Sequence, residues 1–237
     1  MTACLKFVIR VWLVPACLAV LLTPATSHSQ APPAAFGTCV PAAERTSRDV
    51  GCFILTEQTL GTLTPDRAFW HVTSFGSRVD AERENAAAAV KGTVIDALGA
   101  PWLVTIADSA WRPHGGKHVA VIGPLPMTPG VAYAALYMEA TMRPGMKSMI
   151  HRHSGAEAWY TIQGETCLET PNGTQVGRPG RPPVIVPGGE PMELTATGTS
   201  KRESLVLILH DASKPPTSME STWKPSGLCQ RGRTPPR

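Results

Sequence analysis

Short runs of strand-forming residues dominate the chain between residues 131 and 211. Short apolar runs are separated there by turn residues, among them the Pro144-Gly145 and Asn172-Gly173 pairs, which are typical of tight turns and hairpins. We expect strands at 132–142, 147–153, 156–163, 165–170, 174–176, 183–186, 192–197 and 204–210. About eight strands in so short a region predict a jelly-roll β-barrel, because closure removes exposed sheet edges.

Residues 39–126 have the pattern of a small α+β region whose function the sequence does not indicate. Strand-like runs occupy 51–60, 68–75, 93–98, 102–107 and 118–122. Ser77 and Asp80 resemble a capping pair before the helical stretch 81–91, which Gly92 is placed to end. The prolines at 124 and 126 mark the boundary before the barrel.

The first 27 residues predict a cleavable signal peptide. Lys6 and Arg10 precede the apolar run 11–22, which is short for a membrane span and is followed by small residues ending at Ser27. We expect a periplasmic or secreted protein with no stable membrane anchor after cleavage; an uncleaved anchor is the alternative. Residues 28–38 then form a flexible lead-in and 212–237 a proline-rich C-terminal tail.

Four cysteines remain after the signal peptide: Cys39, Cys52, Cys167 and Cys229. In an oxidising compartment they predict two disulfides with three connectivities open. Proximity along the chain favours Cys39–Cys52, which leaves Cys167 to hold the tail through Cys229. Zinc binding by these residues is disfavoured because the chain contains no C-x-x-C pair.

Charge excludes one class of partner. The formal net charge of +4 includes two basic residues of the signal peptide, and no Lys/Arg cluster is interleaved with aromatic residues. A nucleic-acid partner is therefore not expected.

The chemistry of the chain is concentrated in residues 145–164. His151 and His153 are two positions apart, so in a strand both imidazoles point to one face about 7 Å apart. A tight turn after Ser154 would bring Glu157 to the same face on the neighbouring strand. Two imidazoles and one carboxylate predict a metal site that leaves coordination positions open.

This segment resembles the first motif of the cupin superfamily. The motif reads Gly, five residues, His-x-His, three or four residues, Glu, six residues, Gly, and it falls here on Gly145, His151, His153, Glu157 and Gly164. The resemblance covers residues 131–211 and implies a mainly β fold, a cupin-type jelly-roll barrel preceded by the small α+β region. It also implies that the two histidines and the glutamate bind a divalent metal inside the barrel, and that the protein forms a homodimer through outer strands.

The second motif of the family departs from its pattern in this chain. It reads Pro-x-Gly, two residues, His, three residues, Asn; after Pro187, the histidine position holds Met192 and the asparagine position holds Ala196. A thioether is a weak, soft donor, so Met192 is a candidate fourth ligand only for a soft metal. Three ligands still suit iron, manganese or zinc, and a vestigial, metal-free pocket is the alternative.

Strand alternation predicts which side chains surround the site. If Glu157 points inward, three other residues share its face, and Met149 shares the face of the two histidines. His210 ends the last strand and either faces inward or caps the rim. The pocket-lining candidates are therefore Met149, Trp159, Thr161, Gln163 and His210.

Two functions from different classes are consistent with these features. The first is an exported metal-dependent enzyme, dioxygenase-like or an isomerase, that acts on a small organic molecule at the open metal positions. The second is a non-catalytic module of the cell envelope that binds or senses a small molecule or a metal. A structural envelope protein with a relict pocket is a third hypothesis, and the N-terminal region could itself be a degenerate first cupin repeat.

Overall fold

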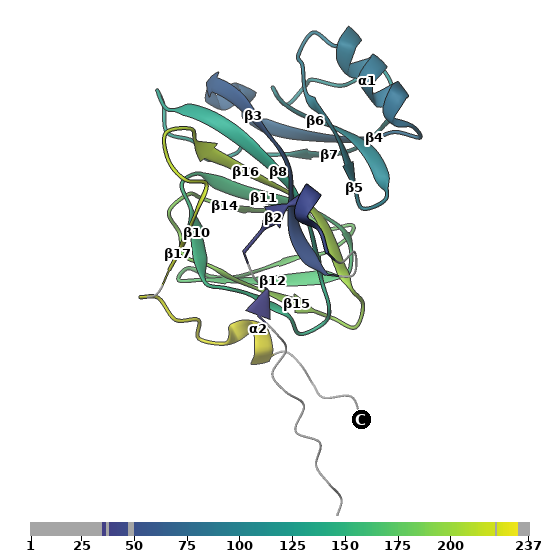
Figure 1. Cartoon of the computed structure of the whole chain (residues 1–237). Helices are drawn as coiled ribbons and strands as arrows, with labels where there is room; N and C mark the ends of the chain where they lie inside the picture. The colour runs from purple at the N-terminus through teal and green to yellow at the C-terminus, as the bar shows by residue number, and fades with distance from the viewer. Residues whose placement is uncertain (1–34, 37, 47–49, 221, 232–237) are drawn as a thin grey trace, which may run out of the picture. The chain divides into compact units, whose positions relative to one another are not determined.

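The computed structural model describes residues 35–36, 38–46, 50–220 and 222–231. The predicted signal peptide lies outside the described residues, as do most of the lead-in and the last six residues of the predicted tail. No helix in the described part of the chain is long and apolar enough to cross a membrane. The described part is mainly β, as expected, and contains one α-helix of more than a single turn (Figure 1).

Two facing sheets form the jelly roll predicted for the second half of the chain. The first has the order β14-β11-β16-β8-β3-β2 and the second β1-β9-β15-β12-β13. The strands of the first sheet are β2 Val40–Pro41, β3 Gly51–Thr62, β8 Ala132–Met142, β11 Ala156–Gln163, β14 Val184–Val186 and β16 Arg202–Asp211. Those of the second sheet are β1 Ala35–Phe36, β9 Lys147–Ser148, β12 Glu165–Thr170, β13 Gly173–Gly177 and β15 Glu193–Thr197.

The core of the jelly roll lies between these two sheets. Buried apolar side chains from β8, β11 and β16 pack there against others from β12 and β15, among them Leu136, Trp159, Leu168, Leu194 and Ile208. Figure 1 shows the two layers, with β12 and β15 below and β8, β11 and β16 above. Packing between the two sheets buries one face of each of these strands.

A third, two-stranded sheet corrects one prediction. The single strand expected over 147–153 is two strands, because β9 pairs with β15 while β10, His151–His153, pairs with β17, Thr217–Met219. Met149 and Ile150 lie between them outside either strand. Both histidines of the predicted site therefore sit on a short strand whose neighbour comes from the predicted tail.

Residues before the barrel form a further four-stranded sheet, in the order β5-β6-β4-β7. Its strands are β4 Phe69–Ser74, β5 Thr93–Ala97, β6 Ala100–Ala107 and β7 Lys117–Ile122. Side chains such as Trp70 and Val104 from this sheet share a hydrophobic core with Tyr137 and Leu207, which belong to β8 and β16. The six-stranded sheet is thus covered on both faces, and β3, which precedes the expected boundary at residue 126, pairs along its length with β8.

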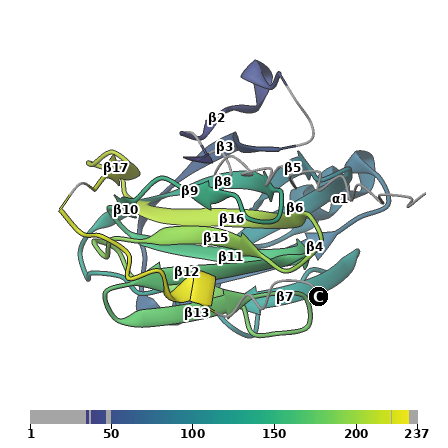
Figure 2. The ribbon, with the colours of Figure 1, turned by 90° about the horizontal axis from the view of Figure 1, so that it is seen from below.

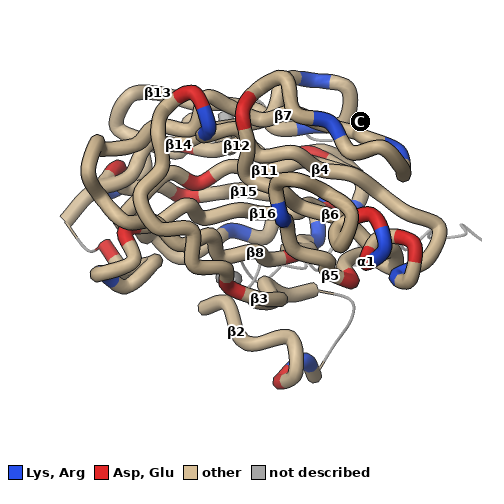
Figure 3. The backbone as a smooth tube through the Cα atoms, turned by 90° about the horizontal axis from the view of Figure 1, so that it is seen from above, with Lys and Arg blue, Asp and Glu red and all other residues tan. Residues whose placement is uncertain are grey.

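The helix of this region is α1, Arg78–Ala87. Its predicted cap is confirmed, because the Ser77 hydroxyl accepts a hydrogen bond from the Asp80 N–H at 3.1 Å. The end expected at Gly92 is wrong. The Asn85 side chain accepts from the Gly92 N–H at 2.8 Å and donates to its carbonyl, so the chain turns back before the glycine. In Figure 3 acidic and basic positions are interspersed along α1 and the described loops.

Both disulfides favoured by the sequence are present. Cys39–Cys52 joins the segment before β2 to β3, and Cys167–Cys229 joins β12 to α2, Leu228–Arg231. Figure 2 shows α2 beside β12 and β13. The second disulfide therefore anchors the C-terminal segment on the outside of the barrel.

His71 on β4 predicts a pH-dependent stability. Its side chain is buried, with Nε2 donating to the Asp108 carbonyl at 2.8 Å and Nδ1 lying 3.3 Å from Nε2 of His118. Burial lowers the pKa of His71 to about 4; the carbonyl opposes this shift, and the charges of His118 and Arg112 add to it. The pKa of His71 in the unfolded chain is about 6.5. The contribution of the neutral, buried His71 to the free energy of unfolding is therefore complete above pH 6.5 and is lost as the pH falls towards 4.

We expect the free energy of unfolding to fall by about 1 to 2 kcal/mol more in the parent than in His71→Gln between pH 7.5 and pH 4.5. Urea unfolding in the presence of a chelator measures this without metal release contributing. Equal falls in the two proteins would show that His71 does not couple folding to protonation.

Candidate metal centre

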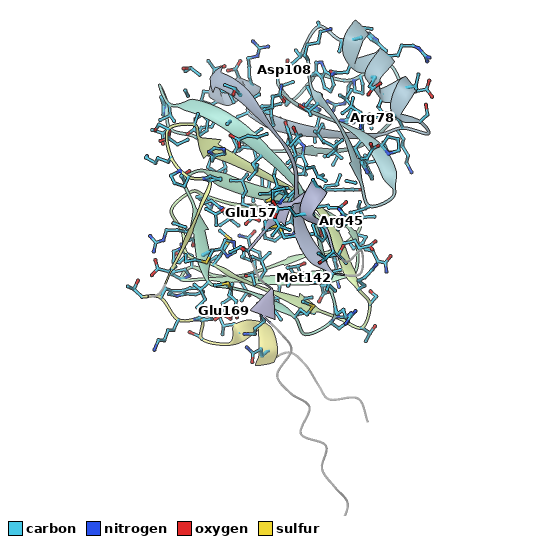
Figure 4. All side chains as sticks on the ribbon, viewed as in Figure 1. Arg45, Arg78, Asp108, Met142, Glu157 and Glu169 are labelled. Atoms are coloured by element: carbon cyan, nitrogen blue, oxygen red, sulfur yellow. A yellow bond between two sulfur atoms is a disulfide. The ribbon has the colours of Figure 1, made fainter. Side chains whose placement is uncertain are left out.

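The three predicted ligands converge at the open end of the jelly-roll core. One ligand atom each from His151, His153 and Glu157 lie within 4.8 Å of one another, and His153 Nε2 is 3.4 Å from Glu157 Oε2. His153 and Glu157 are buried and His151 is half-buried. Figure 4 shows Glu157 inside the barrel, between the two sheets.

Gly155 makes the close turn between the two histidines and the glutamate possible. A Cβ at this position would lie 1.9 Å from the Leu209 carbonyl oxygen, and a Cβ on Gly188 would lie 2.7 Å from the Gly155 Cα. The turn is further held by the Gly189 N–H, which donates to the His153 carbonyl at 2.8 Å. Only a residue without a side chain lets β10 pass into β11 this close to β16.

Backbone carbonyls set the tautomers of both histidines. His151 Nδ1 is 2.8 Å from the Met149 carbonyl oxygen, and His153 Nδ1 is 3.0 Å from that of Pro216. A carbonyl can only accept, so Nδ1 carries the proton in each ring and Nε2 presents a lone pair. This is the arrangement that orients metal-binding histidines.

Two buried atoms at the convergence point have no hydrogen-bond partner among the described residues. They are His153 Nε2 and Glu157 Oε2. Buried polar groups are rarely left in this state, and a lone pair facing a carboxylate oxygen is satisfied by a cation between them. The donor set of two imidazoles and one carboxylate suits iron(II), manganese or zinc, so these residues fit a divalent metal.

The charge states of the ligands agree with this fit. Burial alone would raise the pKa of Glu157, but His153, His151 and Arg202 outweigh it and hold that pKa below its ordinary value. Burial lowers the pKa of His151, although the charge of Glu157 opposes that shift. The site therefore offers a carboxylate and a neutral His151 imidazole, both ready to coordinate, near neutral pH.

A strap from the C-terminal segment supports His153, and sequence reasoning missed it. The hydroxyl of Thr217 lies 3.0 Å from His153 Nδ1, and Ser154 bonds to the carbonyls of Pro215 and Pro216. Arg152 forms an ion pair with Glu220 at the end of the strap. The strand in this strap is three residues long, too short for a periodicity to reveal it.

We predict that Thr217→Val lowers metal affinity by about 10-fold, at the lower end of the usual effect of a group behind a metal-bound histidine. Valine keeps the shape of threonine but removes the hydroxyl that lies beside Nδ1. Competition with a chromogenic chelator measures the affinity. Ser218→Ala, at an exposed position on the same strand, is the matched control, and equal affinities in the two variants would contradict the role of Thr217.

A cavity of about 280 Å³ opens beside the ligands. Most of its wall is apolar, and includes Ile54, Leu136, Met138, Met142, Val206 and Ile208. Figure 4 shows Met142 inside the barrel with Glu157. This volume suits a small organic ligand.

The other pocket candidates occupy different places. Met149 lines the cavity and is partly exposed. Trp159 and Thr161 are buried and Gln163 is exposed; none of the three is part of the cavity wall. On the inward face of β11, Glu157 lines the cavity, whereas Trp159 and Thr161 are buried outside its wall.

His210 and Met192 also lie outside the cavity wall. His210 is buried, with Nδ1 bonded to the Asp211 carbonyl at 3.0 Å and Nε2 3.3 Å from Glu57. Met192 is fully buried in the core, and its backbone forms a bridge with His151. The fourth-ligand position of the second motif thus lies opposite His151, to which it is hydrogen-bonded through the backbone, but it holds the apolar side chain of Met192.

Two histidines on one strand and a glutamate on the next now point between the facing sheets of a jelly roll. The fold is of cupin type. Sequence comparison gives no matching family model and no matching curated protein. The ligand positions are those that the first cupin motif implies.

Comparison with solved structures gives similar folds at low identity. An oxalate oxidase in complex with the substrate analogue glycolate shares 16% identity over 36% of this chain and 45% of its own, with a TM-score of 0.31. A cupin domain from Bordetella pertussis Tohama I shares 21% identity over 32% of this chain and 80% of its own, with a TM-score of 0.28. Oxalate decarboxylase from Bacillus subtilis shares 23% identity over 38% of this chain and 24% of its own, with a TM-score of 0.30. The chain spans less than half the length of either oxalate enzyme.

Proposed function

We propose that this cupin-type protein is a metal-dependent enzyme that acts on a small organic molecule in the cavity beside His151, His153 and Glu157. The observation that carries the proposal is the pair of buried, unpartnered atoms on His153 and Glu157 that face each other next to that cavity. A divalent cation there would supply Lewis acidity and open coordination positions for substrate. The chain's own residues would hold it, exclude water and orient the ligand.

The contents of the cavity favour a dioxygenase-like reaction over an isomerisation. Its titratable side chains, among the described residues, are the three proposed ligands and Arg202. Proton transfer by a dedicated protein base has no second carboxylate or imidazole to use, whereas oxidation at a metal depends mainly on open positions. The apolar wall would hold the body of the substrate.

Export is part of this proposal. Two disulfides are characteristic of oxidising compartments, so the protein would act in the periplasm or outside the cell. Its substrate would then be a molecule met in those compartments.

A binding or sensing module is the second candidate. The observation that favours it is Met192, which occupies the usual fourth-ligand position and is packed in the core. A site held by three protein ligands binds metal more weakly, and a module that samples metal or ligand reversibly could use that property.

Metal analysis of the protein purified from the exported fraction tests the proposal. We expect about one iron, manganese or zinc ion per chain, as a single site requires. Oxygen consumption with a panel of small carbonyl, phenolic and thiol compounds then separates enzyme from binder. If the parent protein binds no metal, even after reconstitution with each ion, the proposed metal-dependent function is wrong. Bound metal without turnover would favour the binding module.

A further inference from the structure

Arg202, at the start of β16, is a charged side chain buried inside the barrel. It is 2% exposed, and it lines the same cavity as Glu157. Its Nη1 lies 3.9 Å from the Met142 sulfur, a weak acceptor, while Nε and Nη2 have no partner among the described residues. An arginine with free donors in an apolar interior is costly, so a ligand that accepts from those donors would relieve a large penalty.

The free donors form one edge of the guanidinium. Nε–H and the neighbouring Nη2–H are parallel, which is the geometry that matches the two oxygens of a carboxylate. A phosphate would need further donors for its remaining oxygens, and the rest of the cavity wall is largely apolar. The shape of the vacant hydrogen-bonding edge therefore favours a planar, singly charged anion.

The charge balance of the cavity points in the same direction. Glu157 is the single acidic residue among those that line it, and Arg202 is the single permanent cation. Burial lowers the pKa of Arg202 to about 10, against the influence of Glu157, so the side chain stays positive near neutral pH. Once a divalent metal is bound, one carboxylate faces three positive charges, and an anionic ligand restores the balance.

We propose that Arg202 binds the carboxylate of the ligand, and that this protein acts on small carboxylic acids whose apolar part packs against Leu136, Met138 and Ile208. This inference deepens the proposed function, because it names the substrate class of the same cavity. Sequence reasoning missed Arg202, since it lies between Lys201 and Glu203 in a charged run before an apolar strand and matches no motif.

Matched pairs of probes test the charge preference in the parent protein. Benzoate against benzamide and hexanoate against hexanamide differ in charge but little in shape. Calorimetric titration should give dissociation constants about 10- to 100-fold lower for each acid than for its amide, as expected for charge-assisted hydrogen bonds to a buried group. Equal affinities for acid and amide, or binding of neither acid, would overturn the proposal without any variant being needed.

Two substitutions then assign the preference to this residue. Arg202→Met should remove the preference for the acids, and Arg202→Lys should retain only part of it, because an ammonium cannot donate along a fixed edge. Arg181→Met, at an exposed turn, is the matched control and should leave both affinities unchanged. Undiminished preference for the acids in a folded Arg202→Met protein would refute the role of Arg202.

Repeating the titrations after metal removal separates this inference from the proposed function. If the parent protein binds no metal but still prefers the acids, the role of Arg202 is supported and the metal-dependent function fails. Bound metal without a preference for the acids would refute the inference while the metal site stands.

Discussion

Replacing His153 by alanine is expected to abolish stoichiometric metal binding. His153 is more buried than His151. Its Nε2 faces Glu157, and its Nδ1 is hydrogen-bonded to the Pro216 carbonyl. Loss of a direct ligand should lower affinity by more than about 100-fold, beyond the range of changes behind the ligands. His151→Ala should act in the same direction, and metal content after gel filtration measures both.

A matched histidine distinguishes this effect from a general loss of histidine. His114 has an exposed side chain far along the chain from the site, and His114→Ala should retain the metal content of the parent. Circular dichroism shows whether the His153 variant remains folded. A folded His153→Ala protein that still retains one metal per chain would place the metal elsewhere.

Removing the Cys167–Cys229 disulfide should destabilise the protein more than removing Cys39–Cys52. The bridged positions are separated by 62 residues in the first case and by 13 in the second. In the loop-entropy model this corresponds to about 4 kcal/mol and about 3 kcal/mol of unfolding free energy. The disulfide that closes the longer loop restricts the unfolded chain more, so removing that disulfide increases the entropy of the unfolded chain more.

Denaturant unfolding of the two double serine variants measures this order. Single variants would leave a free thiol, so each pair is replaced together. The parent protein under oxidising conditions is the reference, and the slope of the unfolding transition shows whether two-state behaviour is kept. A larger loss for the Cys39/Cys52 variant would show that its contacts around β2 and β3 outweigh chain entropy.

Local patterns predicted most of the barrel because its strands are short apolar runs separated by strong turn residues. The strands 132–142, 156–163 and 165–170 agree with the structure at both ends. Strand 147–153 was predicted wrongly, since periodicity does not show which neighbour a strand pairs with. Most of β8 is buried on both faces, a property that comes from the four-stranded sheet packed on its outer side.

The sequence by itself determined the candidate ligand triad of this protein. His151, His153 and Glu157 lie within seven consecutive residues, so strand geometry and one glycine turn are enough to bring them together. Short-range geometry of this kind is encoded locally and is independent of distant pairing.

Only the tertiary structure decided what faces the triad. Arg202 follows Glu157 by 45 residues and Thr217 follows His153 by 64, and both reach the site through antiparallel pairing of strands distant in sequence. Which residues meet across such pairs depends on register and on the packing of two sheets, neither of which has a local signal. The arginine that we propose binds an anion and the strap behind His153 therefore became visible only in the folded chain.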